Sequence, residues 1–147
     1  MIDVGAKMAT DREATAVGRV HMSQAAIEGL AAGELPKGDA LATARVAGIL
    51  AAKRTPEIIP LCHQIPLSYV EVGFAVDREA GEVKITATAR AHASTGVEME
   101  ALTAVVVAAL TIHDMCKGLD PAAEIRAVHL VRKSGGEAGI WKRSRGC

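Results

Sequence analysis

The chain has 147 residues with a formal net charge of zero, and 50% of the residues are apolar. This length suits one domain, and a domain of this size buries enough surface to fold without disulfide bonds. A neutral chain is a poor candidate for strong non-specific binding to nucleic acid or to an acidic membrane surface. These two classes of partner are therefore set aside.

The cysteine content indicates a reducing compartment. Cys62, Cys116 and Cys147 are too few to form a disulfide framework. The first residues lack the basic head and apolar core of a signal peptide, and the longest apolar run, 104–112, is too short to cross a bilayer. We therefore expect a cytoplasmic protein.

The charge is distributed unevenly along the chain. Residues 126–147 hold six Lys or Arg and one Asp or Glu, whereas residues 1–125 hold 11 and 16. This basic C-terminal tail is most simply a solvated chain end; the alternative is that Lys133 contacts an anionic ligand. We treat residues 1–147 as a single domain that begins with an irregular, charged N-terminal arm over 1–13.

The first half of the chain predicts one strand and two helices. A strand over 14–21 is followed by a helix over 24–32, which Ser23 can cap. A second helix covers 40–53, and Pro56 is expected to end it by restricting the preceding residue. Three prolines between residues 56 and 66 predict an ordered loop without regular structure.

The second half predicts a hairpin, a long helix and a final strand. Alternating apolar residues over 69–77 and 82–92 indicate two paired strands. A helix over 97–116 and a strand over 125–133 complete the order β-α-α-β-β-α-β. This order is close to a split βαβ, so we predict an α+β, ferredoxin-like sandwich with helices on one face of an antiparallel sheet.

The long helix is apolar around most of its circumference. Such a helix is usually buried on two sides, and one side can lie on the sheet. In so small a domain the natural cover for the other side is a second subunit. We therefore predict a homo-oligomer whose interface contains this helix.

Charged residues mark both ends of the long helix. Asp114 and Lys117 share a face, where they are either a structural ion pair or an acid/base couple. Glu98 and Glu100 lie in the first turn, where an interaction with the helix dipole is equally reasonable. Because the 14 residues from Glu100 to Asp114 span about 21 Å, one copy of the helix cannot bring both ends to one small-molecule site. Two antiparallel copies could.

Other candidate residues are less specific when taken alone. Cys62-His63 lies in the proline-rich loop, but two neighbouring residues make no closed zinc site, so we predict no metal. A His63 that contacts phosphate or base is the stronger interpretation. Lys37 and Lys53 lie near helix ends, where surface charges are common, although with Lys133 they could form a polyphosphate site. The sequence has no Walker A motif and no GxGxxG.

Six strings in order along the chain carry a specific resemblance. They are 37–39 (KGD), 51–56 (AAKRTP), 59–63 (IPLCH), 95–103 (TGVEMEALT), 114–117 (DMCK) and 133–136 (KSGG). Together they closely resemble the family of cyclic pyranopterin monophosphate synthases, or molybdenum cofactor biosynthesis protein C, over residues 2–139. Gln64, His113 and the pair Glu137-Ala138 depart from the common family pattern.

The resemblance implies a lyase that converts 3′,8-cyclo-7,8-dihydro-GTP into cyclic pyranopterin monophosphate with release of pyrophosphate. It implies a homohexamer, built as a trimer of dimers, with active sites at the dimer interface. No cofactor of the protein's own is implied, although Mg²⁺ could arrive bound to the triphosphate.

The resemblance also suggests roles for individual residues. Asp114 resembles the catalytic acid/base of the family, with Lys117 beside it. The positions that resemble substrate-binding ones are Leu61, Cys62, His63, Glu98, Met99 and Glu100. The basic residues expected around the triphosphate are Lys37, Lys53 and Lys133.

Two other hypotheses make different predictions. A non-catalytic module would bind the cyclised GTP without converting it. A purely structural oligomer, in which the charged pairs are only ion pairs, would show no thermal shift with any purine triphosphate.

Overall fold

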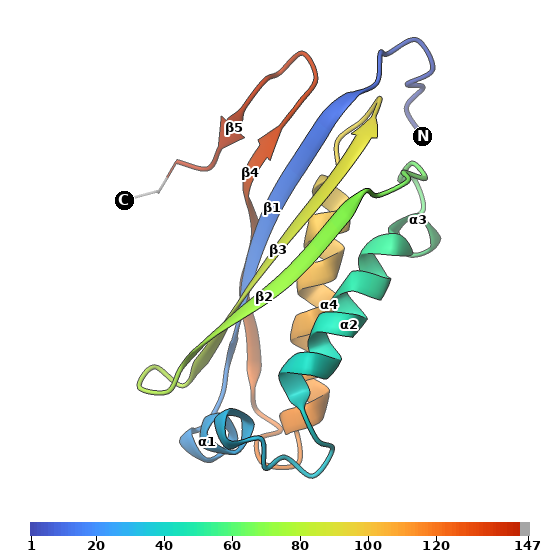
Figure 1. The fold of residues 1–147 in the computed structure, drawn as a ribbon. Coiled ribbons are helices and arrows are strands. Elements are labelled where there is room, and N and C mark those ends of the chain that lie inside the picture. The colour runs from blue at the N-terminus through green and yellow to red at the C-terminus, as the bar shows by residue number, and fades with distance from the viewer. Residues whose placement is uncertain (145–147) are drawn as a thin grey trace.

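Figure 1 shows an antiparallel sheet with two long helices along one face, in a computed structural model that describes residues 1–144. The strands are β1 (Thr10–His21), β2 (Tyr69–Asp77), β3 (Glu82–Ala93), β4 (Glu124–Ser134) and β5 (Trp141–Lys142). The helices are α1 (Gln24–Ala32), α2 (Ala40–Lys53), α3 (Thr55–Ile58) and α4 (Glu98–Cys116).

The sheet has the strand order β2-β3-β1-β4-β5, and each neighbouring pair is antiparallel. The order β4-β1-β3-β2 is that of a split βαβ, in which the connection from β1 to β2 leaves room for β3 between them. The predicted α+β, ferredoxin-like fold with helices on one face is therefore confirmed.

The core forms where alternate residues of the central strands meet α4. Val83, Ile85 and Ala87 of β3 are fully buried, as the alternating pattern predicts. Gly18 of β1 lies so close to α4 that an added Cβ would be 2.6 Å from Val105 Cγ1. The absence of a side chain at this position lets the helix lie directly on the sheet.

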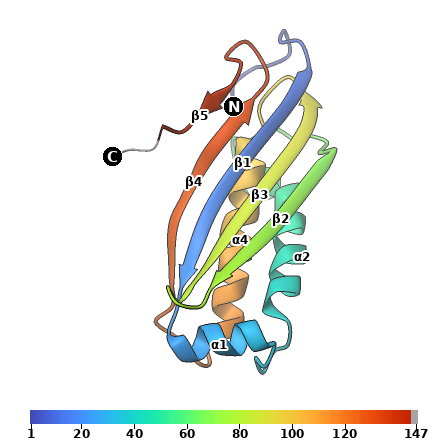
Figure 2. The same cartoon turned by 60° about the vertical axis from the view of Figure 1, so that its left-hand side comes forward.

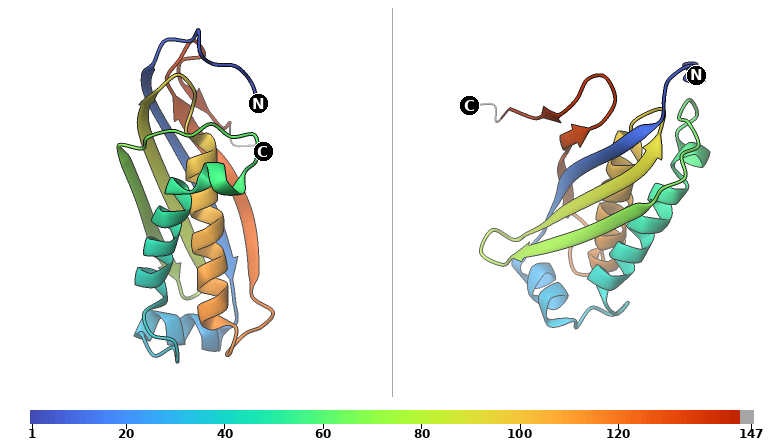
Figure 3. Two further views of the ribbon diagram at one scale, coloured as in Figure 1. Left: turned by 90° about the vertical axis from the view of Figure 1, so that its right-hand side faces the viewer. Right: turned by 45° about the horizontal axis from the view of Figure 1, so that its top comes forward.

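Helices α2 and α4 lie side by side on that face (Figures 2 and 3). Small residues allow the close approach: a Cβ added at Gly48 of α2 would be 2.9 Å from the carbonyl oxygen of Ala104. By length and composition alone α4 could cross a membrane, but 56% of its most apolar window is buried within the domain. Its place in the core therefore explains part of its apolar character.

Two predicted boundaries were wrong. Strand β1 begins at Thr10 rather than at residue 14, because residues 10–13 pair with β3 and Glu13 also pairs with β4, so the irregular arm covers only 1–9. The predicted loop after α2 begins with the short helix α3, with Pro56 in its first turn. Proline is tolerated there because its missing N–H has no partner in a helix start.

The basic tail is partly structured. Trp141 and Lys142 pair with β4, and Arg143 Nε donates to the carbonyl oxygen of Leu130 at 3.0 Å. Trp141, Lys142 and Arg143 are therefore paired with β4 rather than frayed, and all three remain exposed to solvent as predicted. Arg145 and Cys147 lie outside the described residues.

Candidate active site

Three charged side chains meet at the C-terminal end of α4. Lys37 Nζ is 2.6 Å from Asp114 Oδ2, and Lys117 Nζ is 2.7 Å from Asp114 Oδ1. About half of each side chain is exposed, so the group can be reached from solvent. Hydrogen bonds from Lys117 and then Lys37 lower the pKa of Asp114 from its ordinary 3.8 to about 2. We call Lys37, Asp114 and Lys117 the lysine–aspartate cluster.

Local structure explains how these three residues converge. Asp114 and Lys117 are one helical turn apart at the end of α4. Lys37 lies in the turn before α2, closed by the N–H of Gly38 donating to Leu35 O at 2.9 Å. Gly38 has a φ of +97°, which favours glycine, and Asp39 then caps α2 through Ala42 N. The side chain of Asp39 therefore occupies a backbone N–H group at the start of α2 that could otherwise bind an anion.

A buried carboxyl group lies at the opposite end of α4. Glu100 is only 2% exposed, and its Oε2 has no hydrogen-bond partner. The nearest polar contact of its other oxygen, Oε1, is the Cys62 thiol, with Sγ 3.9 Å away. Burial raises the pKa of Glu100, and burial followed by the charge of Glu100 raises the pKa of Cys62. A thiol with a raised pKa stays protonated at neutral pH, so Cys62 is not suited to be a nucleophile.

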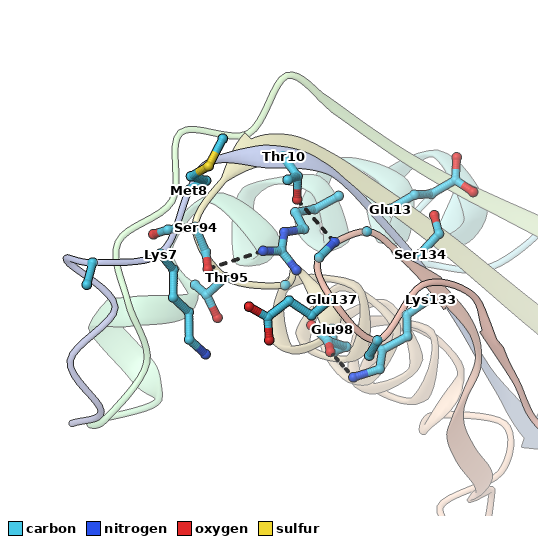
Figure 4. A pocket seen from close by; sticks show the side chains of 16 residues that line it. Lys7, Met8, Thr10, Glu13, Ser94, Thr95, Glu98, Lys133, Ser134 and Glu137 are labelled. Carbon is cyan, nitrogen blue, oxygen red and sulfur yellow. Dashed lines mark hydrogen bonds and ion pairs between the residues drawn. The ribbon is translucent and has the colours of Figure 1, made fainter.

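Glu98 points elsewhere and forms an ion pair with β4. Its Oε1 is 2.7 Å from Lys133 Nζ, and its carboxyl group folds over Gly96. Both side chains line a hollow of about 820 Å³ between the N-terminal arm, the β3–α4 loop and the β4–β5 loop. Figure 4 shows Lys7, Thr95, Glu98 and Lys133 around this hollow.

Sequence reasoning missed several residues of this hollow. Arg12 donates through Nε to Ala93 O at 3.1 Å and through Nη2 to Ser94 O at 3.2 Å. It also lies under Gly136, whose N–H donates to Thr10 Oγ1 at 3.1 Å. These contacts join segments that are far apart in the chain, and a charged stretch near the N-terminus gives no signal for them.

The remaining candidates lie near the same end of α4. His63 Nε2 donates to the carbonyl oxygen of Ile2 at 2.7 Å, which connects the proline-rich loop to the N-terminal arm. Leu61 and Met99 are exposed apolar residues. Lys53 ends α2 and is exposed.

One copy of the chain therefore holds two separate groups of candidate residues. The lysine–aspartate cluster lies at one end of α4, whereas Cys62 with Glu100, and Glu98 with Lys133, lie at the other. The structure does not bring the two groups together within one chain. Among residues 1–144, no group of three or more His, Cys, Asp or Glu side chains could hold a metal ion.

The outer face of the two long helices is apolar and exposed. Leu110 of α4 is 56% exposed and Val106 is 44% exposed, and Val46 and Leu50 of α2 are exposed in the same way. An apolar surface of this kind, on helices that are otherwise well packed, is typical of a protein interface.

Comparison with known proteins identifies the family. The family model described as MoaC family matches residues 1–136. A protein named cyclic pyranopterin monophosphate synthase from Roseiflexus castenholzii is 58% identical over 139 residues, which cover 95% of this chain and 88% of the relative. The synthase of Chloroflexus aggregans is 54% identical over 97% of this chain and 87% of its own length.

A third relative gives the same result. The protein named cyclic pyranopterin monophosphate synthase 2 from Mycobacterium tuberculosis is 52% identical over 143 residues, covering 97% of this chain and 84% of the relative. These matches extend over both ends of α4 and over every strand from β1 to β4. The chain therefore belongs to the MoaC family.

Proposed function

We propose that this chain is a cyclic pyranopterin monophosphate synthase, an enzyme of molybdenum cofactor biosynthesis. It converts 3′,8-cyclo-7,8-dihydro-GTP into cyclic pyranopterin monophosphate and releases pyrophosphate, as a phosphorus–oxygen lyase. The observation that carries the proposal is the position of Lys37 and Lys117 on the two oxygens of Asp114, in a chain of the MoaC family.

We assign proton transfer to the lysine–aspartate cluster. With a pKa of about 2, Asp114 is ionised at neutral pH and cannot be the proton donor. Its carboxylate instead holds two ammonium groups at a fixed spacing, and Lys117 can give a proton to a nitrogen or oxygen of the substrate as the ring is opened and rebuilt. Asp114 and Lys117 are therefore the proposed catalytic residues.

We assign substrate binding to the other end of α4. Lys133, Lys53 and His63 lie there and, with Lys37 of the lysine–aspartate cluster of a neighbouring chain, can neutralise the triphosphate and the departing pyrophosphate. Leu61, Cys62 and Met99 offer an aliphatic surface to the purine-derived ring. Glu98 and Glu100 complete this set; Glu98 fixes Lys133, and the buried Glu100 lies beside Cys62.

A shared site between two chains follows from these assignments. If both ends of α4 serve one substrate, an antiparallel partner helix must bring its lysine–aspartate cluster beside the Glu100 of the first chain. The exposed Val106 and Leu110 support such a contact, because burying them would remove apolar surface from water. We further propose that these dimers assemble as a homohexamer, a trimer of dimers.

Two further expectations belong to the proposal. We expect the enzyme to work in the cytoplasm, where the free thiols of Cys62 and Cys116 would stay reduced. Mg²⁺ bound to the triphosphate would be part of the substrate, and its charge would help to stabilise the leaving pyrophosphate.

Incubation with the cyclised GTP substrate tests the proposal directly. The wild-type protein should release pyrophosphate and a pterin product, and Lys117→Ala and Asp114→Asn should each lower kcat by about 100-fold or more. Asp77→Asn is the matched control, because Asp77 accepts a hydrogen bond from Ala80 N in a hairpin turn, outside the cluster. Binding without turnover by the wild-type protein, or normal turnover by both cluster variants, would contradict these roles.

A further inference from the structure

The two lysines of the lysine–aspartate cluster lie in two turns, and both turns contact α1. Lys117 begins the turn over 117–123 that leaves α4, and Lys37 belongs to the turn over 34–38 that leaves α1. Figure 2 shows α1 lying across the end of α4, below the sheet. The carboxylate attracts both ammonium groups, which repel each other, and the two turns determine where the two lysine backbones lie around it.

The carboxylate of Asp120 fastens the first of these turns to α1. Its Oδ2 accepts from Ser23 N at 2.7 Å, and its Oδ1 accepts from Ala122 N at 3.0 Å. Its own N–H donates to Cys116 O at 3.0 Å, so one residue links the last turn of α4 to the start of α1. Because Ser23 is the N-cap of α1, the helix dipole also favours a carboxylate at this place.

The other end of α1 holds the second turn. The N–H of Glu34 donates to Gly29 O at 2.9 Å, which closes the helix end. The side chains of Leu119 and Leu35 both lie over Gly29, where an added Cβ would be 3.2 Å and 3.4 Å from them. Leu35 is two residues before Lys37 and Leu119 two residues after Lys117, so these contacts join the two lysine turns.

We propose that Asp120 is a positioning residue of the active site, which holds the 117–123 turn on α1 and thereby sets the spacing of Lys37 and Lys117 around Asp114. The proposal rests on the assignment of this cluster to catalysis. Asp120 acts through the backbone: its removal leaves two N–H groups without their acceptor and frees the residues that follow Lys117. A displacement of about 1 Å in a catalytic group can lower a rate about 100-fold.

The test compares Asp120→Ala with Asp77→Ala in the full chain, with cyclised GTP as substrate. Both variants lose a carboxylate that accepts backbone N–H groups in a turn, but only Asp120 is bonded to α1. We expect kcat to fall about 10- to 100-fold in Asp120→Ala, with a smaller change in KM, and to stay near wild type in Asp77→Ala. Asp120→Asn keeps one side-chain acceptor and should recover part of the lost kcat.

A second measurement does not depend on turnover. The carboxyl carbon of Asp114, followed by NMR, should titrate near pH 2 in the wild-type protein and closer to 3.8 in Asp120→Ala, because its lysine partners have moved. Leu119→Ala removes the apolar contact between the 117–123 turn and Gly29 of α1. It should also lower kcat and raise the pH at which Asp114 titrates. This second variant keeps the proposal testable if Asp120→Ala does not fold.

The outcomes separate the two proposals. Wild-type kcat and an unchanged Asp114 titration in Asp120→Ala, or losses equal to those of Asp77→Ala, would overturn the role of Asp120. If the wild-type protein does not convert the substrate, the proposed function fails, while the titration of Asp114 still decides whether Asp120 positions the cluster.

Discussion

Glu100 shows how two neighbouring acidic residues acquire different properties. It is two residues beyond Glu98, and at 3.6 residues per turn the two side chains leave the helix on nearly opposite sides. Glu98 therefore reaches Lys133 at the surface, whereas Glu100 is buried beside Cys62. The sequence identified both residues as candidates. It could not show whether each one interacts with the helix dipole or binds a ligand, because that depends on which side of α4 faces the core.

The buried carboxyl group of Glu100 leads to a prediction about stability and pH. Burial raises its pKa above the ordinary 4.5, so the folded chain keeps this proton to higher pH than the unfolded chain does. The contribution of Glu100 to the free energy of unfolding therefore falls as pH rises above about 4.5. Glu100→Gln has no such titration, so its stability relative to wild type should rise as pH increases above about 4.5.

Urea unfolding at several pH values and one fixed protein concentration measures this difference, since assembly makes stability depend on concentration. Glu28→Gln is a suitable control, because Glu28 is in an exposed ion pair with Arg78. A constant difference between wild type and Glu100→Gln over the whole range would show that Glu100 titrates normally.

The β4–β5 loop has three glycines with positive φ, of which Gly135 and Gly139 form a useful contrast. Gly135 has a φ of +106°, and an added Cβ would be 2.2 Å from the backbone oxygen of Asp11. Gly139, later in the same loop, has a φ of +62° but no atom within 4 Å of an added Cβ. Substituting Gly139 therefore tests backbone strain alone, whereas substituting Gly135 tests strain together with a steric clash.

We predict that Gly135→Ala destabilises the protein by about 1–3 kcal/mol and raises KM, because the loop must shift and Lys133 shifts with it. Gly139→Ala should cost about 1 kcal/mol and leave KM near wild type. Thermal unfolding and steady-state kinetics check both effects. Equal losses of stability for the two variants would mean that the loop absorbs the clash without cost.

The elements themselves were largely predictable, and their irregularities were not. Helix caps at Ser23 and Asp39 and the alternation in β2 and β3 are local signals, and each predicted the observed element. Strand β4 carries two register shifts against β1, and Ala127 has a φ of +52° there. No glycine of β4 itself marks this irregularity, since it arises from pairing with a distant strand, where Gly18 of β1 lies at the second shift.

The candidate residues at opposite ends of α4 predict that two chains share each active site. Glu100→Ala and Asp114→Ala should each be inactive alone. Mixed dimers place both changes in one site and leave the other intact, so random subunit exchange should restore about a quarter of wild-type activity. Exchange confirmed by mass spectrometry without any recovery would place each site within one chain.

An interface variant supplies the control for that experiment. Leu110→Glu puts a charge on the exposed apolar face of α4 and should reduce both the oligomer mass by light scattering and the activity. Leu110→Ala keeps the surface apolar and should remain assembled.

Caps, alternation and six collinear strings are local patterns, and they were enough to predict the order of the main helices and strands, the α+β class and the family, but not α3 or β5. The sequence also required that Glu100 and Asp114 be far apart, since that distance is fixed by one helix. The packing of the folded chain was needed to show that Lys37 meets Asp114, that Arg12 lies under Gly136, and that Asp120 joins α4 to α1. Such contacts join residues distant in the chain, and their partners depend on how the elements pack rather than on any local pattern.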